Sequence, residues 1–419
     1  MATTSPGSQG TLLVTVTGRD QPGVTSALFD SLARFDISVV DVEQVVIRGR
    51  LVLGVLLRAP SGVEARVRDA VAAAVGPLSM DVDVEVQRDP TGGAAAGDEP
   101  GGTSGRRDRS HVTVLGHPLR PKAVAAIAGC IADWGGNIDR IVRIARYPVT
   151  AIELEVSGTD PDRLRAQLAR TAVTVGVDVA VERSGLHRRA KRLVVLDVDS
   201  TLVQGEVIEM LAAHAGCAKE VREVTEAAMR GELDFAESLR ARVRLLAGLD
   251  ATALDDVRRD LVLARGARTF VRTLKRLDYR IAIVSGGFTQ VTDALVEDLG
   301  IDYSAANSLE IVDGRLTGEV VGDVVDRAGK AEALRRFAAA AGVAVSQTVA
   351  IGDGANDLDM LAVAGLGIAY NAKPVVRVAA DAALNVPYLD AILFLLGISR
   401  EEIEEADAAE GIAPETPPT

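Results

Sequence analysis

Two short acidic segments follow apolar runs, and their residue types could hold a metal ion. The first is Asp197–Thr201, which reads DVDST, and the second is Gly352–Asp357, which reads GDGAND. Carboxylates that project close together resist joint ionisation unless a cation lies between them. Mg²⁺ meets that need because it prefers oxygen ligands. An acidic surface turn explains the first segment equally well. A helix N-cap at Asp353 or Asn356 is compatible with metal binding by the second.

A serine and a lysine elsewhere in the chain could hold a phosphate group. Ser285 follows the apolar run 281–284 and precedes two glycines. A hydroxyl followed by free backbone amides at the start of a helix can cradle phosphate, although such turns are frequent without a ligand. Lys330 opens the helical run 330–341, where a cation opposes the helix dipole. That unfavourable position indicates a functional role for Lys330. The alternative is a lysine that is simply solvated.

All of these segments except the lysine follow strands of the kind that form a parallel sheet. The runs 193–196, 281–284 and 348–351 are almost wholly apolar, and each precedes a polar or glycine-rich turn and a helical period. Such a pattern predicts a parallel sheet covered on both faces. Ligands of these sheets bind beyond the carboxyl ends of the strands. The charged, helical region of about 207–266 is too long for a simple crossover and predicts an inserted cap.

The N-terminal part contains a diverged internal repeat over 10–88 and 110–185. Each copy has the pattern β-α-β-β-α-β, which predicts two ferredoxin-like α+β units. Partial alternation of apolar residues in 12–16 and 39–46 predicts sheets with one covered face.

Three segments have compositions typical of a linker, a turn and a disordered tail. The Gly/Ala/Pro-rich stretch 89–109 predicts a flexible linker. Asp313 and Gly314 predict a hairpin turn between strand-like runs. The acidic, proline-containing stretch 400–419 predicts a disordered tail.

Composition limits the classes of partner. The chain has 419 residues, 59 acidic against 46 basic side chains and a net charge of −13. This charge disfavours nonspecific nucleic-acid binding and an anionic membrane surface. Cys130 and Cys217 imply no disulfide framework and fit a reducing cytosol. Without a signal-peptide pattern or an apolar run of membrane-spanning length, we expect a cytoplasmic protein.

Taken together, the catalytic-type segments resemble the motifs of the haloacid dehalogenase superfamily of phosphotransferases. The pattern is DxDx[TV] at Asp197–Thr201, a serine at Ser285, a lysine at Lys330 and GDGxND at Gly352–Asp357, in the expected order. The resemblance implies a Rossmann-like α/β parallel sheet with a helical cap insertion over 190–398. The N-terminal repeat resembles paired ACT domains, which are amino-acid-binding regulatory modules.

Within that superfamily, residues 190–398 resemble the phosphoserine phosphatase family. The resemblance extends to the segments 199–206, 228–235 and 238–243. It implies a Mg²⁺-dependent hydrolysis of O-phospho-L-serine to L-serine and phosphate, the last step of serine biosynthesis. It also implies a phosphoaspartyl intermediate.

The same resemblance assigns the catalytic and metal-binding roles. It implies that Asp197 is the nucleophile and that Asp199 is the general acid and base. Mg²⁺ would be held by Asp197, Asp353 and the backbone carbonyl of Asp199, with Asp357 supporting the site from nearby.

The remaining expected site residues would contact the substrate. Glu206 would pair with its ammonium group and Arg242 with its carboxylate, whereas a dipole-complementing acid and a solvated helix face are the alternatives. Met229 and Phe235 would form an apolar lid. The expected phosphate-side and substrate-binding residues are Ser285, Gly286, Lys330 and Asn356.

The first ACT-like segment carries a loop that resembles the ligand loop of ACT domains. Its residues Gly18, Asp20 and Gly23 would bind an amino-acid effector, with serine as one candidate. The second segment has Gly116-His-Pro-Leu-Arg-Pro at that place and lacks the acidic residue. By analogy with paired ACT domains we expect a homodimer. An enzyme of this fold with another phosphate substrate, and an amino-acid sensor with an inert phosphatase domain, are the rival hypotheses.

Overall fold

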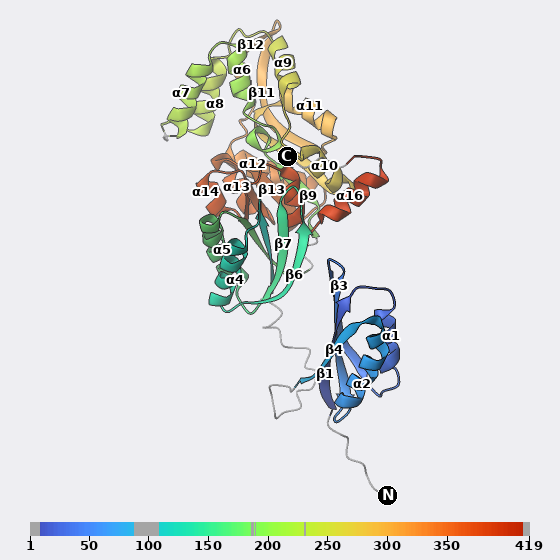
Figure 1. The fold of residues 1–419 in the computed structure, drawn as a ribbon. Coiled ribbons are helices and arrows are strands. Elements are labelled where there is room, and N and C mark those ends of the chain that lie inside the picture. The colour runs from blue at the N-terminus through green and yellow to red at the C-terminus, as the bar shows by residue number, and fades with distance from the viewer. Residues whose placement is uncertain (1–8, 88–108, 186–187, 189, 230–231, 414–419) are drawn as a thin grey trace. The chain divides into compact units, whose positions relative to one another are not determined.

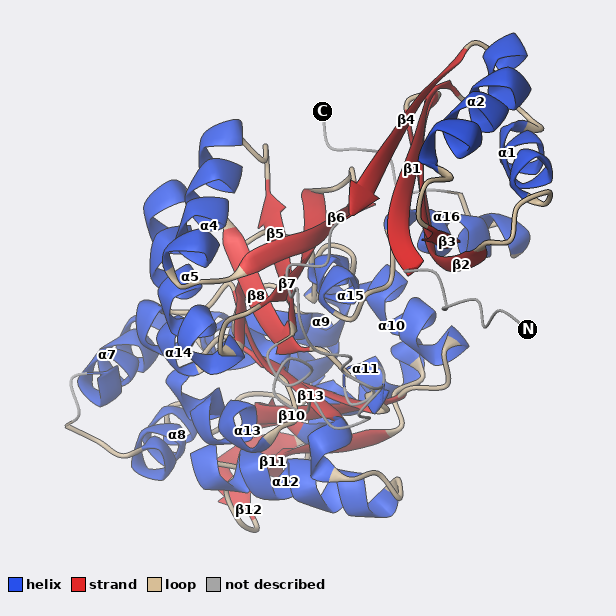
Figure 2. Cartoon of the chain, turned by 90° about the horizontal axis from the view of Figure 1, so that it is seen from below, coloured by secondary structure: helices blue, strands red, loops and turns tan. Residues whose placement is uncertain are grey.

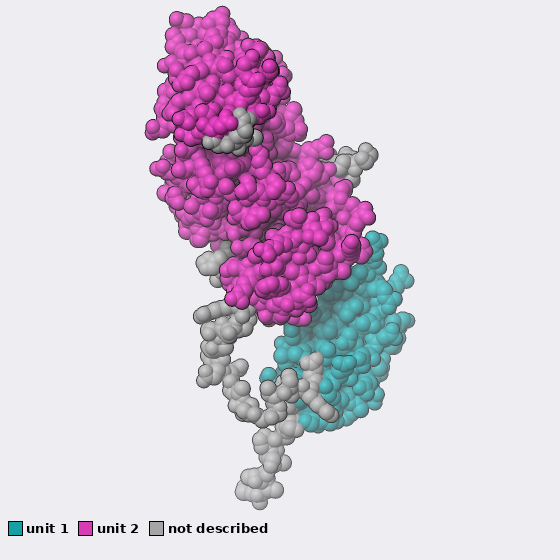
Figure 3. All heavy atoms as spheres, turned by 90° about the vertical axis from the view of Figure 1, so that its left-hand side faces the viewer, with its two compact units in different colours: residues 1–100 teal, residues 101–419 magenta. Residues whose placement is uncertain are grey.

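The computed structural model describes residues 9–87, 109–185, 188, 190–229 and 232–413. The chain divides into two compact units, residues 1–100 and 101–419 (Figure 3). The linker predicted over 89–109 lies outside the described residues, except for its last residue. Within the described ranges, no helix is both long enough and apolar enough to cross a membrane.

The first unit is a four-stranded antiparallel sheet with two helices on one face (Figure 2). The strand order is β2-β3-β1-β4. Along β1, Leu12, Val14 and Val16 are buried against the helices, as the alternation predicted. The elements are β1 (Gln9–Arg19), α1 (Val24–Leu32), β2 (Ser38–Ile47), β3 (Arg50–Pro60), α2 (Glu64–Val75), η1 (Gly76–Leu78) and β4 (Met80–Gln87).

Strand β2 departs from the sequence prediction. Alternation over 39–46 predicted one covered face, but every residue of β2 is exposed, including Val39, Val42 and Val46. The reason is position, because β2 is the edge strand of the sheet and pairs only with β3 among the described strands. The unit therefore presents an apolar, unpaired edge.

The second unit begins with another β-α-β-β-α-β segment. Its helix α5 begins where the Asp160 side chain accepts bonds from the backbone amides of Asp162 and Arg163, and it ends at Gly176 in the left-handed conformation. The elements are β5 (Ser110–Gly116), α4 (Pro121–Asp133), β6 (Asn137–Ala145), β7 (Thr150–Ser157), α5 (Pro161–Val175) and β8 (Asp178–Arg183).

The rest of the second unit is a parallel sheet with helices on both faces. Two separate apolar cores lie on its two faces, and β9, β13 and β14 are fully buried. The strands and adjoining elements of the sheet are β9 (Leu193–Leu196), η3 (Val198–Leu202), α10 (Ala267–Arg276), β10 (Arg280–Phe288), α11 (Thr289–Leu299), β11 (Tyr303–Val312), β12 (Arg315–Val321), α12 (Arg327–Ala340), η4 (Val345–Gln347), β13 (Thr348–Gly352), η5 (Ala355–Asp357), α13 (Leu358–Val363), β14 (Gly367–Tyr370), α14 (Pro374–Ala379), β15 (Ala382–Leu384), η6 (Leu389–Ala391), α15 (Ile392–Leu395) and α16 (Arg400–Ala409).

The cap is helical and lies between β9 and β10 in sequence. Figure 1 shows its helices grouped with the hairpin β11–β12, whose turn is the predicted Asp313-Gly314 pair. Leu309 and Leu316 of the hairpin share a buried core with Val243 of the cap. The cap helices are α6 (Val207–His214), α7 (Ala218–Met229), α8 (Phe235–Arg244) and α9 (Thr252–Asp260).

The ACT-like segment and the parallel sheet of the second unit form one continuous sheet. Its strand order is β12-β11-β10-β9-β13-β14-β15-β8-β5-β7-β6, with Ala382 of β15 paired to Ala180 of β8. The Asp178 carboxylate accepts from the backbone amide of Asn385 at 2.7 Å and from its side-chain nitrogen at 2.6 Å. This joining of the two sheets was not predicted from the sequence.

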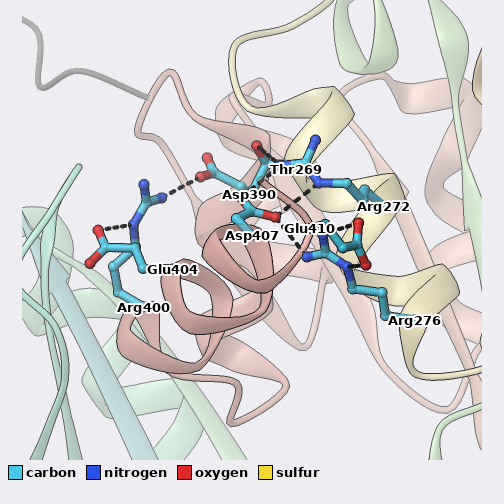
Figure 4. Close-up of polar contacts among 8 residues, drawn as sticks. All are labelled: Thr269, Arg272, Arg276, Asp390, Arg400, Glu404, Asp407 and Glu410. Carbon is cyan, nitrogen blue, oxygen red and sulfur yellow. Dashed lines mark hydrogen bonds and ion pairs between the residues drawn. The ribbon is translucent and has the colours of Figure 1, made fainter. Parts of the chain in front are cut away.

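The prediction of disorder from residue 400 is wrong for residues 400–409, which form helix α16. A capping box at Ser399 and Glu402 starts the helix, and Ile403 is buried in the main core. Figure 4 shows Asp407 between Arg272 and Arg276, with nitrogen–oxygen distances of 2.8 and 2.6 Å. Acidic composition suggested a solvated tail, but helix α10 supplies the matching cations. Residues 414–419 lie outside the described residues.

Candidate active site

A buried charge cluster lies beneath the ends of β9 and β13. Lys330 is fully buried, and its Nζ atom lies 2.7 Å from Oδ1 of Asp197 and 2.6 Å from Oδ1 of Asp357. Burial acts to lower the pKa of Lys330, but the two carboxylates outweigh it and raise that pKa, so the amine stays protonated. Helix α12 begins three residues before Lys330, with Asp326 as its cap.

Three carboxylates converge at this point. Asp197, Asp353 and Asp357 each offer an oxygen within 4.8 Å of the others. Burial, and then the Asp357 carboxylate, raises the pKa of Asp353 to about 6 and raises the pKa of Asp197 well above its usual range. The Thr201 hydroxyl donates to Asp353 at 3.4 Å. Such clustered, partly protonated oxygen donors suit a hard divalent cation, which would relieve the repulsion between them.

Asp199 is held apart from that cluster by its own partners. Its Oδ1 accepts from the backbone amide of Val207 at 2.8 Å, and its Oδ2 accepts from the Ser285 hydroxyl at 3.2 Å. Burial raises the pKa of Asp199. A buried carboxyl group with a raised pKa fits a general acid and base.

The glycines after Ser285 allow close approach. The Gly287 amide donates to the Ser285 hydroxyl at 2.7 Å, and a Cβ atom added at Gly287 would lie 3.1 Å from Oδ2 of Asp199. Asn307, which is almost fully buried, donates to the Gly286 carbonyl at 2.8 Å and fixes this turn. Gly286 lines the pocket described next, whereas the Ser285 and Lys330 side chains lie beneath it.

A cavity of about 420 Å³ lies between the parallel sheet and the cap. Asp197, Asp199 and Asp353 line it from the sheet side, and Glu206 and Arg242 line it from the cap. Nη1 of Arg242 lies 4.0 Å from Oε2 of Glu206. Burial, and then the Asp199 carboxylate, raises the pKa of Glu206. One acid and one guanidinium therefore face the same cavity from the cap.

An aromatic side chain of the cap touches the sheet side of the cavity. A Cβ atom added at Gly286 would lie 2.9 Å from Cζ of Phe235. Asn356 lines the cavity from η5. Met229 ends α7, but its side chain lies outside the described residues.

The expected effector residues lie in the first unit, at the β1–α1 connection. Gly18 is packed so tightly that an added Cβ atom would lie 2.5 Å from the Met80 sulfur. Gly23 caps α1 with a φ of 94°, which suits glycine. Asp20 is exposed, and its backbone amide donates to the Gly49 carbonyl at 2.8 Å. The loop is held by hydrogen bonds and packing, but the backbone amide of Asp20 already donates to Gly49.

Comparisons with known proteins agree with this architecture. Residues 194–362 match the haloacid dehalogenase-like hydrolase family, and residues 10–85 and 109–182 each match an ACT domain family. A phosphoserine phosphatase of Streptomyces coelicolor is 61% identical over 95% of this chain and 94% of that protein. Phosphoserine phosphatase SerB2 of Mycobacterium tuberculosis is 55% identical over 95% of this chain and 96% of that protein. The chain belongs to the phosphoserine phosphatase family.

A solved structure of the same family shares the fold. The probable phosphoserine phosphatase of Vibrio cholerae, in unliganded form, is 36% identical and covers 70% of this chain and 88% of its own, with a TM-score of 0.54. The predicted fold class, a haloacid dehalogenase fold with a helical cap preceded by two ACT domains, is confirmed.

Sequence reasoning missed several residues of this phosphoserine phosphatase site. Asn307 and Thr201 orient other site groups through the hydrogen bonds described above. Arg327 and Lys373 line the cavity. Thr201 belongs to the DxDx[TV] motif, but the motif did not indicate its bond to Asp353. Arg327 could have been suspected from its place near Lys330, whereas no motif marked Asn307 or Lys373.

Proposed function

We propose that this chain hydrolyses O-phospho-L-serine to L-serine and phosphate through a phosphoaspartyl intermediate on Asp197. The observation that carries the proposal is a single cavity lined by two sets of charged residues. Asp197 and Asp199 line it from the sheet side, and Glu206 and Arg242 line it from the cap. A phosphate monoester that also bears an ammonium and a carboxylate group matches both sets.

The chemistry divides into two displacements. The Asp197 carboxylate attacks phosphorus, and the bond from phosphorus to the seryl oxygen breaks. Asp199 donates its proton to that departing oxygen, which its raised pKa supports. Asp199 then accepts a proton from water, which attacks the phosphoaspartate and releases phosphate and free Asp197.

A Mg²⁺ ion is the proposed cofactor. Asp197, Asp353 and the backbone carbonyl of Asp199 would hold it, with Asp357 supporting the site. The convergence of three carboxylates supports this assignment. When bound, the ion would neutralise charge on the phosphoryl oxygens.

The other site residues have proposed binding roles. Ser285 and the Gly286 amide would contact phosphoryl oxygens, Asn356 would contact the substrate, and Lys330 would supply its positive charge from beneath Asp197. Glu206 would bind the ammonium group, and Arg242 would bind the carboxylate.

The proposal also covers closure of the cap over the substrate and binding of an effector. Phe235 and Met229 would exclude water from the closed site. At the first ACT domain, an amino acid, with serine as the candidate effector, would bind near Gly18, Asp20 and Gly23.

The test is turnover of phosphoserine with and without Mg²⁺. We expect Mg²⁺-dependent release of phosphate, and a loss of at least about a thousandfold in kcat for Asp197→Asn. Acid quenching of the wild type should trap a phosphoenzyme that hydroxylamine cleaves, and Asp197→Asn should not form it. Full activity of Asp197→Asn would reject the nucleophile.

A substrate comparison tests the specificity. Arg242→Ala should lose phosphoserine turnover. If it kept that turnover, or if phosphosugars were hydrolysed faster than phosphoserine by the wild type, the substrate assignment would fail. Isothermal titration with serine, followed by turnover with added serine, tests the effector.

We propose a homodimeric assembly in the cytoplasm. The exposed apolar edge at Val39, Val42 and Val46 of β2 supports dimerisation, because an unpaired edge can pair with a second copy. The free thiols of Cys130 and Cys217 are compatible with a reducing compartment. Sedimentation of the wild type against Val42→Lys tests the dimer, and we expect the variant to be monomeric.

A further inference from the structure

Lys373 lies in a tightly held turn at the mouth of the cavity. The turn joins β14 to α14, and its residue Asn371 adopts a φ of 46°, in the left-handed region. The Asn371 amide donates to the Leu384 carbonyl at 2.8 Å, and the Lys373 amide donates to the Asp353 carbonyl at 3.4 Å. The backbone of Lys373 is therefore anchored to a residue of the proposed metal site.

The Lys373 side chain lines the same cavity as Glu206 and Arg242. Burial raises the pKa of Glu206 overall, and the positive charge of Lys373 acts against that rise. Lys373 therefore acts electrostatically on a charged residue that faces it from the cap.

Two other cations line the cavity, and both already have partners. Arg327 binds Asp359, with Nε to Oδ1 at 2.8 Å. Arg242 lies 4.0 Å from Glu206, which offsets part of its charge. Among the described residues, Lys373 has no such ion pair.

Local structure does not explain a lysine at this position. Lys373 precedes α14 at its N-cap, where its side chain makes no capping bond. A cation is unfavourable at a helix N-terminus because the helix dipole is positive there. The side chain is also exposed, so it does not fill the core.

We propose that Lys373 is a specificity-determining residue that binds the substrate carboxylate from the sheet side, opposite Arg242. This inference rests on the proposed function. The phosphate already has Ser285 and the Gly286 amide, and the ammonium group has Glu206. The carboxylate has only Arg242, whose charge Glu206 partly offsets, so a second cation completes the match.

The test compares two substrates that differ in the carboxylate. Lys373→Met keeps the length of the side chain and removes its charge, and Lys373→Arg restores the charge. O-phosphoserine carries the carboxylate, whereas O-phosphoethanolamine lacks it. Lys219→Met is the matched control, because Lys219 is exposed on α7 and does not line the cavity.

We expect Lys373→Met to raise the KM for phosphoserine by about tenfold. Its kcat should change little, because the substitution removes only the proposed contact with the substrate carboxylate and leaves the backbone bond to Asp353 in place. Turnover of phosphoethanolamine should be unaffected, Lys373→Arg should recover most of the affinity, and Lys219→Met should match the wild type. Thermal unfolding of Lys373→Met should also match the wild type, since the side chain is exposed.

Two results would overturn the inference. Equal losses on both substrates would place Lys373 at the phosphate instead, and unchanged kinetics on both would make it a solvated lysine. In either case the wild type would still hydrolyse phosphoserine. A wild type without phosphoserine turnover would instead reject the proposed function itself.

Discussion

The ammonium nitrogen of Lys330 lies 2.7 Å from Oδ1 of Asp197, and the Lys330 side chain is fully buried. The same nitrogen lies 2.6 Å from Asp357. One buried cation thus holds two carboxylates together. Removing one member of such a buried group leaves the others without compensation.

We therefore predict that Lys330→Met destabilises the protein by about 3–5 kcal/mol and abolishes turnover. Urea unfolding monitored by circular dichroism gives the free energy of unfolding. Arg335→Met is the control, because Arg335 is exposed on the same helix and does not line the cavity. Unfolding of Lys330→Met at the wild-type urea concentration would contradict the prediction.

Contact between the cap and the sheet predicts a steric effect at Gly286. An alanine there would place its Cβ atom 2.9 Å from Cζ of Phe235 and displace the ring. We expect Gly286→Ala to lower kcat/KM by about ten- to hundredfold, because small displacements disturb the reacting geometry.

A double variant separates this contact from other effects of the alanine. Phe235→Leu in the Gly286→Ala background should recover part of the loss, since the ring no longer blocks the added methyl group. Gly129→Ala is the control, because its Cβ atom would meet nothing within 4 Å. Additive losses in the double variant would show that the ring and the glycine do not interact.

The Asp353 carboxyl group predicts how metal binding depends on pH. Its pKa is raised from 3.8 to about 6, so the metal-free fold is stabilised by the protonated form. That stabilisation, at most about 3 kcal/mol, is complete below the unfolded pKa and is lost as pH rises through about 6. Mg²⁺ requires the ionised carboxylate, so its affinity should rise over the same range.

Thermal unfolding with and without Mg²⁺ measures this dependence. The increase in Tm on adding Mg²⁺ should be small near about pH 5 and much larger near about pH 7.5. Asp353→Asn should show a weak increase at both. An equal increase for the wild type at both pH values would rule out control by this carboxyl group.

The ion pairs of α16 predict a stabilising role for the C-terminal helix. Burial acts to raise the pKa of Asp407, but hydrogen bonds from Arg272 and Arg276 outweigh it and lower that pKa. Asp407→Asn should therefore lower the free energy of unfolding by about 1–3 kcal/mol at neutral pH. Because a lowered pKa stabilises the fold only above it, the difference from the wild type should shrink as pH falls below about 4.

The exposed face of the same helix supplies the control. Glu405 is exposed on α16, so Glu405→Gln should leave stability unchanged. A loss for Glu405→Gln equal to that for Asp407→Asn would point to helix charge in general rather than to the Asp407 pairing.

The order of elements and the catalytic-type motifs could be predicted from local sequence. Asp197 and Asp353 follow short apolar runs, and parallel strands bring their carboxyl ends to one edge of a sheet. Their convergence therefore needs only the strand pattern. The helices of both ACT segments follow likewise from periodicity and caps, as at Asp160.

Contacts between distant segments were decided by the tertiary structure. Acidic composition predicted disorder after residue 400, yet Asp407 meets Arg272 and Arg276, which come more than a hundred residues earlier in the chain. Three other features also depend on contacts between distant segments. They are the pairing of Ala180 with Ala382, the bond from Asn307 to Gly286 and the place of Lys373 at the cavity.

Residue type and periodicity thus determined which strands and turns form and which side chains could do chemistry, because these depend on neighbours along the chain. The fold alone decided that β2 is left uncovered and that Lys330 lies beneath Asp197. Burial and long-range pairing set the energies of those groups, and both depend on which distant elements pack together.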